Sequence, residues 1–400
     1  MERAKTEPRI AVPFDAGKLD DLLEQAGIDV LVATSKHNVQ YLLGGYRFFF
    51  FDYMDAIGVS RYLPVLIYQR GRPENAAYLG NRLEVYEKEL DRFWTPVVET
   101  RFWGSTDAMR AAVDHIRRLG PGIRRIGIEA AFLPADAATV LEDGLDVEIV
   151  DALVPLESLR ARKSPQELAL LREASERVVG SMMAVFGAAA PGMTKHELVE
   201  ALRREEVSRG LTFEYCLITS GTSLNRAPSD RRIEAGDILS LDSGANYRGY
   251  IGDLCRMGLL GEPDAELEDL LAAVDEIQQA ARKSVRAGVR GGDVMAAGQA
   301  LVDASPHKPY LDFVAHGMGL ISHEAPRLTG TGAVTYPGDH TDRPLESGMV
   351  LSIETTMLHP RRGFIKLEDT VAVTDSGCEG FGDTDRGWNR AGRAQRAPGA

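Results

Sequence analysis

Hydrophobic positions in the first part of the chain alternate between a helical and a strand period. In KLDDLLEQAGIDVLVATS, leucines recur at helical spacing up to Gly27, and an unbroken apolar run follows at residues 30–32. Other strand-like runs lie at 62–68, 76–80, 125–129 and 147–152, with helical patterns over 106–119 and 135–141. This alternation predicts an α/β domain over residues 1–155.

A pair of helices opens the next part of the chain. Ser164 is a good N-cap, Pro165 stands at the first helical position and Glu167 completes a capping box, so a long helix is expected up to Pro191. Thr194 caps a second helix that runs toward Gly210.

The pattern then changes to strands and turns. Strand-like segments are CLITSG, DILSLDSGANYRGYIGDLCRMG, FVAHGMG, MVLSIETTM and FIKLEDTVAVT, and two helices are predicted at 264–287 and 292–305. Segregated helices and strands predict an α+β domain over residues 156–380. From residue 381 the sequence turns basic and loses its periodicity, which predicts a mobile tail over 381–400.

Composition excludes several classes of protein. With 44% hydrophobic and 26% charged residues, the 400-residue chain is typical of globular proteins. The net charge of −13 disfavours binding to nucleic acid or to an anionic membrane, and no apolar run reaches the roughly 18 residues of a membrane span. Three scattered cysteines and an N-terminus without an apolar signal segment predict a cytoplasmic protein.

Four acidic residues interrupt apolar strand segments of the second domain: Asp242, Asp253, Glu354 and Glu368. A buried carboxylate is costly unless it is paired with a cation. Asp242 and Asp253 flank the turn GANYRG, so we expect a hairpin to bring them face to face. With His316 they make an oxygen-rich set that suits two close divalent ions, with Mn, Co, Fe and Zn as the candidates.

These segments carry a family resemblance. LDSGANYRGYIGDLCR, AHGMGLISHEAPRL, GMVLSIETTM and KLEDTVAVT resemble the pita-bread metallopeptidase family of Xaa-Pro aminopeptidases, prolidases and creatinase. SKHNVQYLLGGY and the linker LVPLESLRARKSPQELALLREA resemble the creatinase/prolidase N-terminal domain and its connection. The resemblance implies a creatinase/prolidase-type α/β domain followed by an α+β pita-bread catalytic domain.

The resemblance also implies roles for individual residues. Asp242 would bind one ion, His316 and Glu354 the other, and Asp253 and Glu368 would bridge both. Glu354 would accept the proton of the attacking water, and His323 would support the scissile carbonyl oxygen. The implied reaction is hydrolysis of a C–N bond in a dipeptide or another small substrate, as in Xaa-Pro dipeptidases and aminopeptidases.

Two positions depart from the family pattern. Asn225 stands in SGTSLNRAPSDR where these peptidases typically have histidine, and Lys366 replaces the usual arginine two residues before the last glutamate. Substrate recognition is therefore expected to have changed. Creatinase-like or ectoine-hydrolase-like C–N hydrolysis, a dimethylsulfoniopropionate-lyase-like elimination and a non-catalytic binding protein remain as alternatives.

Residues outside the ligand set are candidates for substrate contacts. Asn225, His340 and Arg343 are polar groups in segments near the ligand strands, and Phe49 belongs to the aromatic run YRFFFFDYMD. The resemblance implies a homodimer in which this aromatic run can reach the partner's active site.

Overall fold

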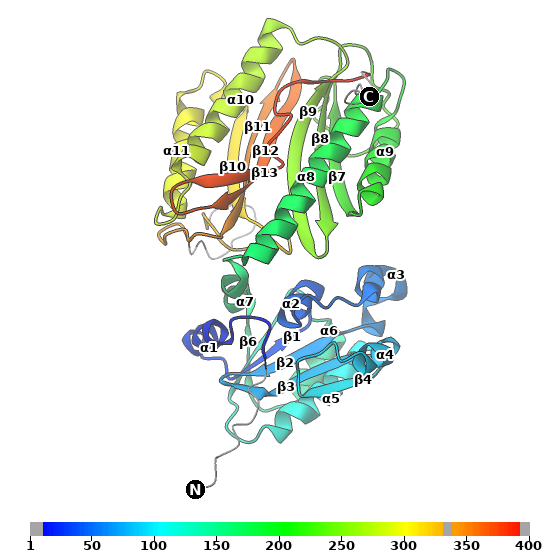
Figure 1. The fold of residues 1–400 in the computed structure, drawn as a ribbon, viewed down its shortest axis with the longest axis vertical. Coiled ribbons are helices and arrows are strands. Elements are labelled where there is room, and N and C mark those ends of the chain that lie inside the picture. Colours follow the sequence, from blue (N-terminus) through cyan, green and yellow to red (C-terminus); the bar gives the residue numbers. More distant parts are fainter. Residues whose placement is uncertain (1–10, 331–337, 339, 393–400) are drawn as a thin grey trace. The chain divides into compact units, whose positions relative to one another are not determined.

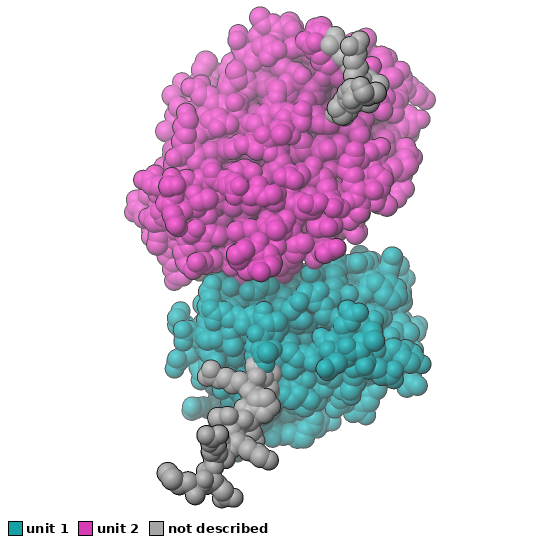
Figure 2. All heavy atoms as spheres, viewed as in Figure 1, with its two compact units in different colours: residues 1–159 teal, residues 160–400 magenta. Residues whose placement is uncertain are grey.

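The computed structural model describes residues 11–330, 338 and 340–392. The chain divides into two compact units, Met1–Leu159 and Arg160–Ala400 (Figure 2). The boundary expected at residue 155 lies inside helix α7 (Leu153–Arg160), and the division falls at the end of that helix.

Unit 1 contains a six-stranded mixed sheet (Figure 1) in the order β4-β3-β2-β1-β5-β6. Its strands are β1 (Val30–Ala33), β2 (Val65–Gln69), β3 (Arg72–Asn81), β4 (Val97–Phe102), β5 (Arg125–Ile128) and β6 (Glu148–Asp151). The sequence pattern predicted five of these strands and missed β4. β2 runs antiparallel to β1 and β3, whereas the other neighbours are parallel.

Both faces of this sheet are covered, which explains why β1 is apolar throughout. Leu31 joins a core with Leu19 of α1, and Val32 joins a second core with Met109 of α5 on the opposite face. The helices are α1 (Ala16–Gln25), α2 (Lys36–Leu42), α3 (Met54–Ile57), α4 (Val85–Glu89), α5 (Ser105–Arg118) and α6 (Ala135–Gly144), with short 3₁₀ turns η1 (Phe49–Tyr53), η2 (Val59–Arg61) and η3 (Arg82–Glu84).

Unit 2 contains an eight-stranded sheet with the strand path β10-β11-β12-β9-β8-β7. The strands are β7 (Thr212–Ser220), β8 (Ile238–Tyr247), β9 (Tyr250–Leu259), β10 (Leu311–Gly317), β11 (Val350–His359), β12 (Gly363–Val373), β13 (Cys378–Phe381) and β14 (Asn389–Arg390). β13 pairs with β12, and β14 pairs with β9.

Four helices pack against this sheet on the side that faces the viewer in Figure 1. They are α8 (Pro165–Ala188), α9 (Lys195–Ser208), α10 (Ala265–Ser284) and α11 (Gly291–Ala304), with the 3₁₀ turn η4 (Lys308–Tyr310) after them. Both predicted capping boxes form, at Ser164 with Glu167 and at Thr194 with Glu197. No helix within the described ranges is both long enough and apolar enough to cross a bilayer.

The segment predicted to be a mobile tail is bound to unit 2 over its described part. β14 adds to β9, Trp388 donates to the Leu267 carbonyl at 3.0 Å, and Arg386 pairs with Asp369. Arg386 is therefore a largely buried partner of an aspartate and not part of a solvated mobile chain. Residues 393–400 of the predicted tail lie outside the described residues.

Candidate metal centre

The strand alternation of unit 2 puts the predicted ligands on one face of the sheet. Leu241, Leu254, Ala315, Ile353 and Leu367 each stand next to a predicted ligand and pack into the cores beneath the helices. Because successive side chains of a strand point to opposite faces, the neighbouring ligands project from the helix-free face. These ligands are Asp242, Asp253, His316, Glu354 and Glu368, and the two glutamates are direct partners in the β11–β12 register.

The β8–β9 hairpin sets the position of the two aspartates. Arg248 and Gly249 form its two-residue turn with φ of 53° and 100°, as a primed turn requires. Asp242 pairs with Cys255, and Asp253 pairs with Gly244. The expectation that the aspartates face each other directly was therefore wrong, because the register places them diagonally, two residues apart along the hairpin.

Gly244 allows a tyrosine to reach the second aspartate. A Cβ at this position would lie 2.4 Å from the ring of Tyr215, whose hydroxyl donates to Asp253 Oδ2 at 2.7 Å. Burial, followed by repulsion from Glu368 and Asp242, raises the pKa of Asp253 well above its ordinary value. A single hydrogen bond from a hydroxyl does not offset the cost of burying this carboxylate, so the position is suited to a bound cation.

His316 has the orientation of a metal ligand. Its Nδ1 lies 3.3 Å from the Gly317 carbonyl, which can only accept, so the neutral imidazole has its proton on Nδ1 and its lone pair on Nε2. Nε2 is buried, faces Glu354 Oε1 at 3.7 Å and Glu368 Oε1 at 3.9 Å, and has no hydrogen-bond donor among the described residues. A lone pair that faces two carboxylates calls for a cation between them.

Three of the predicted ligands fit a divalent ion closely. Asp253, His316 and Glu368 each offer one donor atom, and these atoms lie within 4.8 Å of one another. Ser352 Oγ donates to Glu368 Oε1 at 2.7 Å and so orients this carboxylate. The donor set of imidazole and carboxylates is one that Mn, Fe, Co and Zn accept.

Two cationic side chains lie among the predicted ligands, and neither was predicted as a ligand or a catalytic residue. Lys366 Nζ lies 2.8 Å from Asp242 Oδ2, 2.6 Å from Glu354 Oε2 and 2.8 Å from Glu368 Oε2. Burial by itself lowers the pKa of this ammonium, but the carboxylates raise it well above its ordinary value. The guanidinium of Arg226 also pairs with Asp242.

The loop that carries His323 is held by a buried ion-pair network. Glu324 accepts from Arg160 and from Lys163, each at 3.0 Å, and all three side chains are almost fully buried. The predicted catalytic His323 stacks on His316, with ring centroids 3.8 Å apart and planes 9° apart. Burial, with a smaller effect of His316, lowers the pKa of His323 to about 4, so its imidazole is neutral at physiological pH.

The predicted substrate residues of unit 2 lie in different environments. Asn225 is exposed in a turn, where its Oδ1 accepts from the Ala227 amide at 2.9 Å. The neighbouring Arg226, rather than Asn225, reaches the cluster. His340 is buried, and its backbone bonds to Gly291 and to Arg327 of the His323 loop, whereas Arg343 is exposed. A role of these residues in substrate binding stays a prediction.

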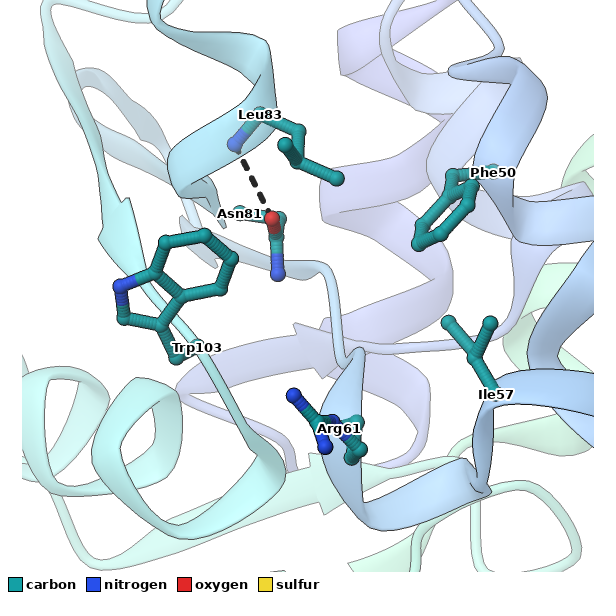
Figure 3. A pocket seen from close by; sticks show the side chains of 6 residues that line it. All are labelled: Phe50, Ile57, Arg61, Asn81, Leu83 and Trp103. Atoms are coloured by element: carbon teal, nitrogen blue, oxygen red, sulfur yellow. Dashed lines mark hydrogen bonds between the residues drawn. The ribbon is translucent and has the colours of Figure 1, made fainter.

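Phe49, the predicted substrate residue of unit 1, is 62% exposed in η1. A pocket of about 320 Å³ lies in the same unit (Figure 3) and is lined by Phe50, Ile57, Arg61, Asn81, Leu83 and Trp103. This lining contains one cation but neither carboxylate nor imidazole. The pocket is mainly apolar and has no side chain that could act as a base or bind a metal, so the catalytic candidates are the residues of unit 2.

Comparison with known proteins agrees with this geometry. Residues 169–375 match metallopeptidase family M24, and residues 16–162 match the creatinase/prolidase N-terminal domain. An uncharacterized peptidase, YqhT, of Bacillus subtilis is 25% identical over 371 residues, with 90% of this chain and 95% of that protein covered. A Xaa-Pro dipeptidase of Pyrococcus horikoshii is 23% identical over 384 residues, with coverage of 92% and 97%.

The fold is also that of solved structures. A Xaa-Pro dipeptidase from Bacillus anthracis superposes with a TM-score of 0.78 at 22% identity, covering 94% of this chain and 98% of that one. The predicted creatinase/prolidase-type domain and pita-bread domain are thereby confirmed, as is the prediction of a metallohydrolase. The chain belongs to metallopeptidase family M24.

Proposed function

We propose that the protein is a metal-dependent dipeptidase of the Xaa-Pro type, which hydrolyses the C–N bond of a small peptide. The observation that carries the proposal is the buried Nε2 of His316, which has no hydrogen-bond partner among the described residues and faces two carboxylates close to Asp253. Relatives named as Xaa-Pro dipeptidases support the substrate class. None of these names favours the creatinase-like, lyase or non-catalytic alternatives.

The ligands of the divalent ion would be Asp253, His316, Glu354 and Glu368, with Asp242 completing the donor set predicted for two ions. When bound, a divalent ion supplies Lewis acidity that polarises the scissile carbonyl and lowers the pKa of the attacking water. The Lys366 ammonium lies within 2.8 Å of three of these carboxylates and offsets part of their negative charge.

Glu354 is the proposed general base. Its side chain is 18% exposed, compared with 3% for Glu368 and 3% for Asp242, so water reaches it most easily of the three. His323 is neutral and therefore offers one N–H, which we assign to the carbonyl oxygen of the substrate as negative charge develops there. Its stacking on His316 keeps that N–H next to the ligands.

The experiment is an assay of the purified chain, stripped with a chelator and reconstituted with Mn, Co, Fe or Zn. Xaa-Pro dipeptides, other dipeptides and Xaa-Pro tripeptides form the panel. We expect metal-dependent release of proline from dipeptides, its loss in His316→Ala, and its retention in His196→Ala, a histidine exposed on α9. Activity that survives chelation, or a failure to cleave any peptide of the panel, would contradict the proposal.

The predictions of a cytoplasmic homodimer belong to the same proposal. All three cysteines are free thiols, which suits a reducing compartment. Phe49 and Tyr53 expose 62% and 54% of their surface, which suits an interface. Light scattering is expected to give the mass of a dimer for the wild-type chain. For Phe49→Ser it is expected to show dissociation into monomers at a higher protein concentration than for wild type.

A further inference from the structure

The donor atoms of the centre divide into two groups that differ in their cations. Asp253, His316 and Glu368 converge on one point, and of these three only Glu368 contacts a side-chain cation, Lys366, while His316 Nε2 has no hydrogen-bond partner among the described residues. Asp242, by contrast, is already paired with Lys366 Nζ at 2.8 Å and with the guanidinium of Arg226. Asp242, which the family resemblance assigns to one ion alone, is therefore the carboxylate that two side-chain cations reach.

Lys366 is held in this position by the strand that carries it. It stands two residues before Glu368 on β12, so both side chains share the helix-free face. Its side chain is only 4% exposed and cannot extend its ammonium into solvent. Phe364, two residues earlier on the same face, is also buried and offers no anion. An ammonium displaced by a dication would be buried without comparable partners, which is costly.

The formal charges agree with a single ion. With the four carboxylates ionised, Asp242, Glu354 and Glu368 pair with Lys366 or Arg226 and Asp253 pairs with neither, so four negative and two positive formal charges leave a surplus of two negative charges. One divalent ion cancels this surplus. Two divalent ions would leave two positive charges in a site that is largely buried.

We propose that the cationic groups of Lys366 and Arg226 occupy the position of one of the two predicted ions, so that the chain binds one divalent ion, next to His316. This inference rests on the proposed metallopeptidase function for the identity of the site. It concerns the number of ions and their place, which activity alone does not report.

The test is the metal content of the purified chain. Protein is loaded with excess Mn²⁺, passed through a desalting column and analysed by plasma mass spectrometry, with the site located by anomalous diffraction at the manganese edge. Wild type is expected to hold one ion per chain, with one anomalous peak beside His316. Lys366→Met and the double variant Arg226→Ala/Lys366→Met are both expected to hold two ions per chain, with the higher occupancy of the second ion in the double variant. Lys308→Met, which removes an exposed lysine paired with Asp303, is the control and is expected to hold one.

The outcomes distinguish this inference from the proposed function. Two ions in the wild-type chain overturn the inference and leave a metallopeptidase. No ion in the wild-type chain overturns both. One ion in wild type and in the double variant overturns the claim that the two side chains occupy the second position. The wild-type anomalous map decides the location of the ion even where a variant does not fold.

Discussion

Two clusters of charged side chains lie on opposite faces of β12, and they differ in the balance of their charges. Glu368 belongs to the helix-free face, where three of the four carboxylates meet Lys366 or Arg226. The next residue, Asp369, faces the helices and meets three arginines. Two of these arginines also pair with further aspartates. The arginines are Arg256, Arg282 and Arg386, and the further aspartates are Asp275 and Asp383.

The difference separates a structural ion-pair network from a ligand site. Three arginines and three aspartates neutralise each other without any bound ion, so the helix-facing cluster is complete as folded. The opposite cluster is short of two positive charges, which a divalent ion can supply. Buried charges are costly unless they are paired, so the unbalanced face is the one that requires a ligand.

The largest expected effect comes from removing a charge on the unbalanced face. Asp253→Asn deletes a proposed metal ligand but keeps an oxygen that can accept from Tyr215. We expect metal affinity and kcat/KM to fall by more than about 100-fold, the upper range for a second-shell residue, because a direct ligand is lost. Calorimetric titration with Mn²⁺ and the dipeptide assay measure both.

The same substitution has the opposite consequence without metal. Asp253→Asn relieves repulsion among buried carboxylates, so the free energy of unfolding in chelator is expected to stay level or rise. A fall of more than about 1 kcal/mol would show that Asp253 is structural, and would contradict the distinction between the two faces.

Asp369→Asn is the matched change on the balanced face. It leaves one buried and two partly buried arginines without one of their anions, and we expect a loss of about 3 kcal/mol in the free energy of unfolding, measured by urea denaturation. Asp375→Asn, in an exposed turn after β12, is the control and is expected to stay within about 0.5 kcal/mol. An equal effect of the two variants would refute the structural role of the cluster.

Glu206 provides a smaller effect that depends on pH. This α9 carboxyl accepts from Ser243 at 2.9 Å, and burial raises its pKa to about 8 from an ordinary value of 4.5. The folded chain keeps a proton that the unfolded chain releases between these values, so this stabilisation is complete below about pH 4.5 and declines as pH rises toward 8. Glu206→Gln is expected to be more stable than wild type at pH 8, and the difference is expected to shrink toward zero as the pH falls to about 4.5.

Urea denaturation of both chains from pH 5 to pH 8 checks this prediction. The difference between the two chains isolates Glu206, because other titrating groups act on both. Parallel stability profiles would mean that the carboxyl is ionised in the folded protein throughout this range.

Asn225→Ala has the smallest expected effect. The side chain is exposed and its oxygen caps the Ala227 amide, so kcat/KM is expected to change by no more than about twofold. A tenfold rise in KM with unchanged kcat would instead establish Asn225 as the substrate contact that its sequence position suggested.

Elements with a clear period were predictable from the sequence. The capping residues Ser164 and Thr194 marked the starts of α8 and α9, and the apolar runs marked five strands of unit 1. β4 was missed because its residues, VVETRF, mix apolar and charged positions at the sheet edge. The docking of residues 381–392 was also missed, since a basic composition does not indicate that Arg386 has a buried partner in Asp369.

The sequence by itself determined which residues can bind a metal, because acidic residues inside apolar strands and one histidine carry that chemistry locally. Strand alternation then implied that they share a face. The tertiary structure decided which cations reach them. Lys366 is two residues from Glu368 in the chain, but its contact with Asp242 spans 124 residues. Arg226, in the β7–β8 connection, also meets Asp242. Charge balance in a buried site depends on such distant partners, so the number of ions is a property of the fold.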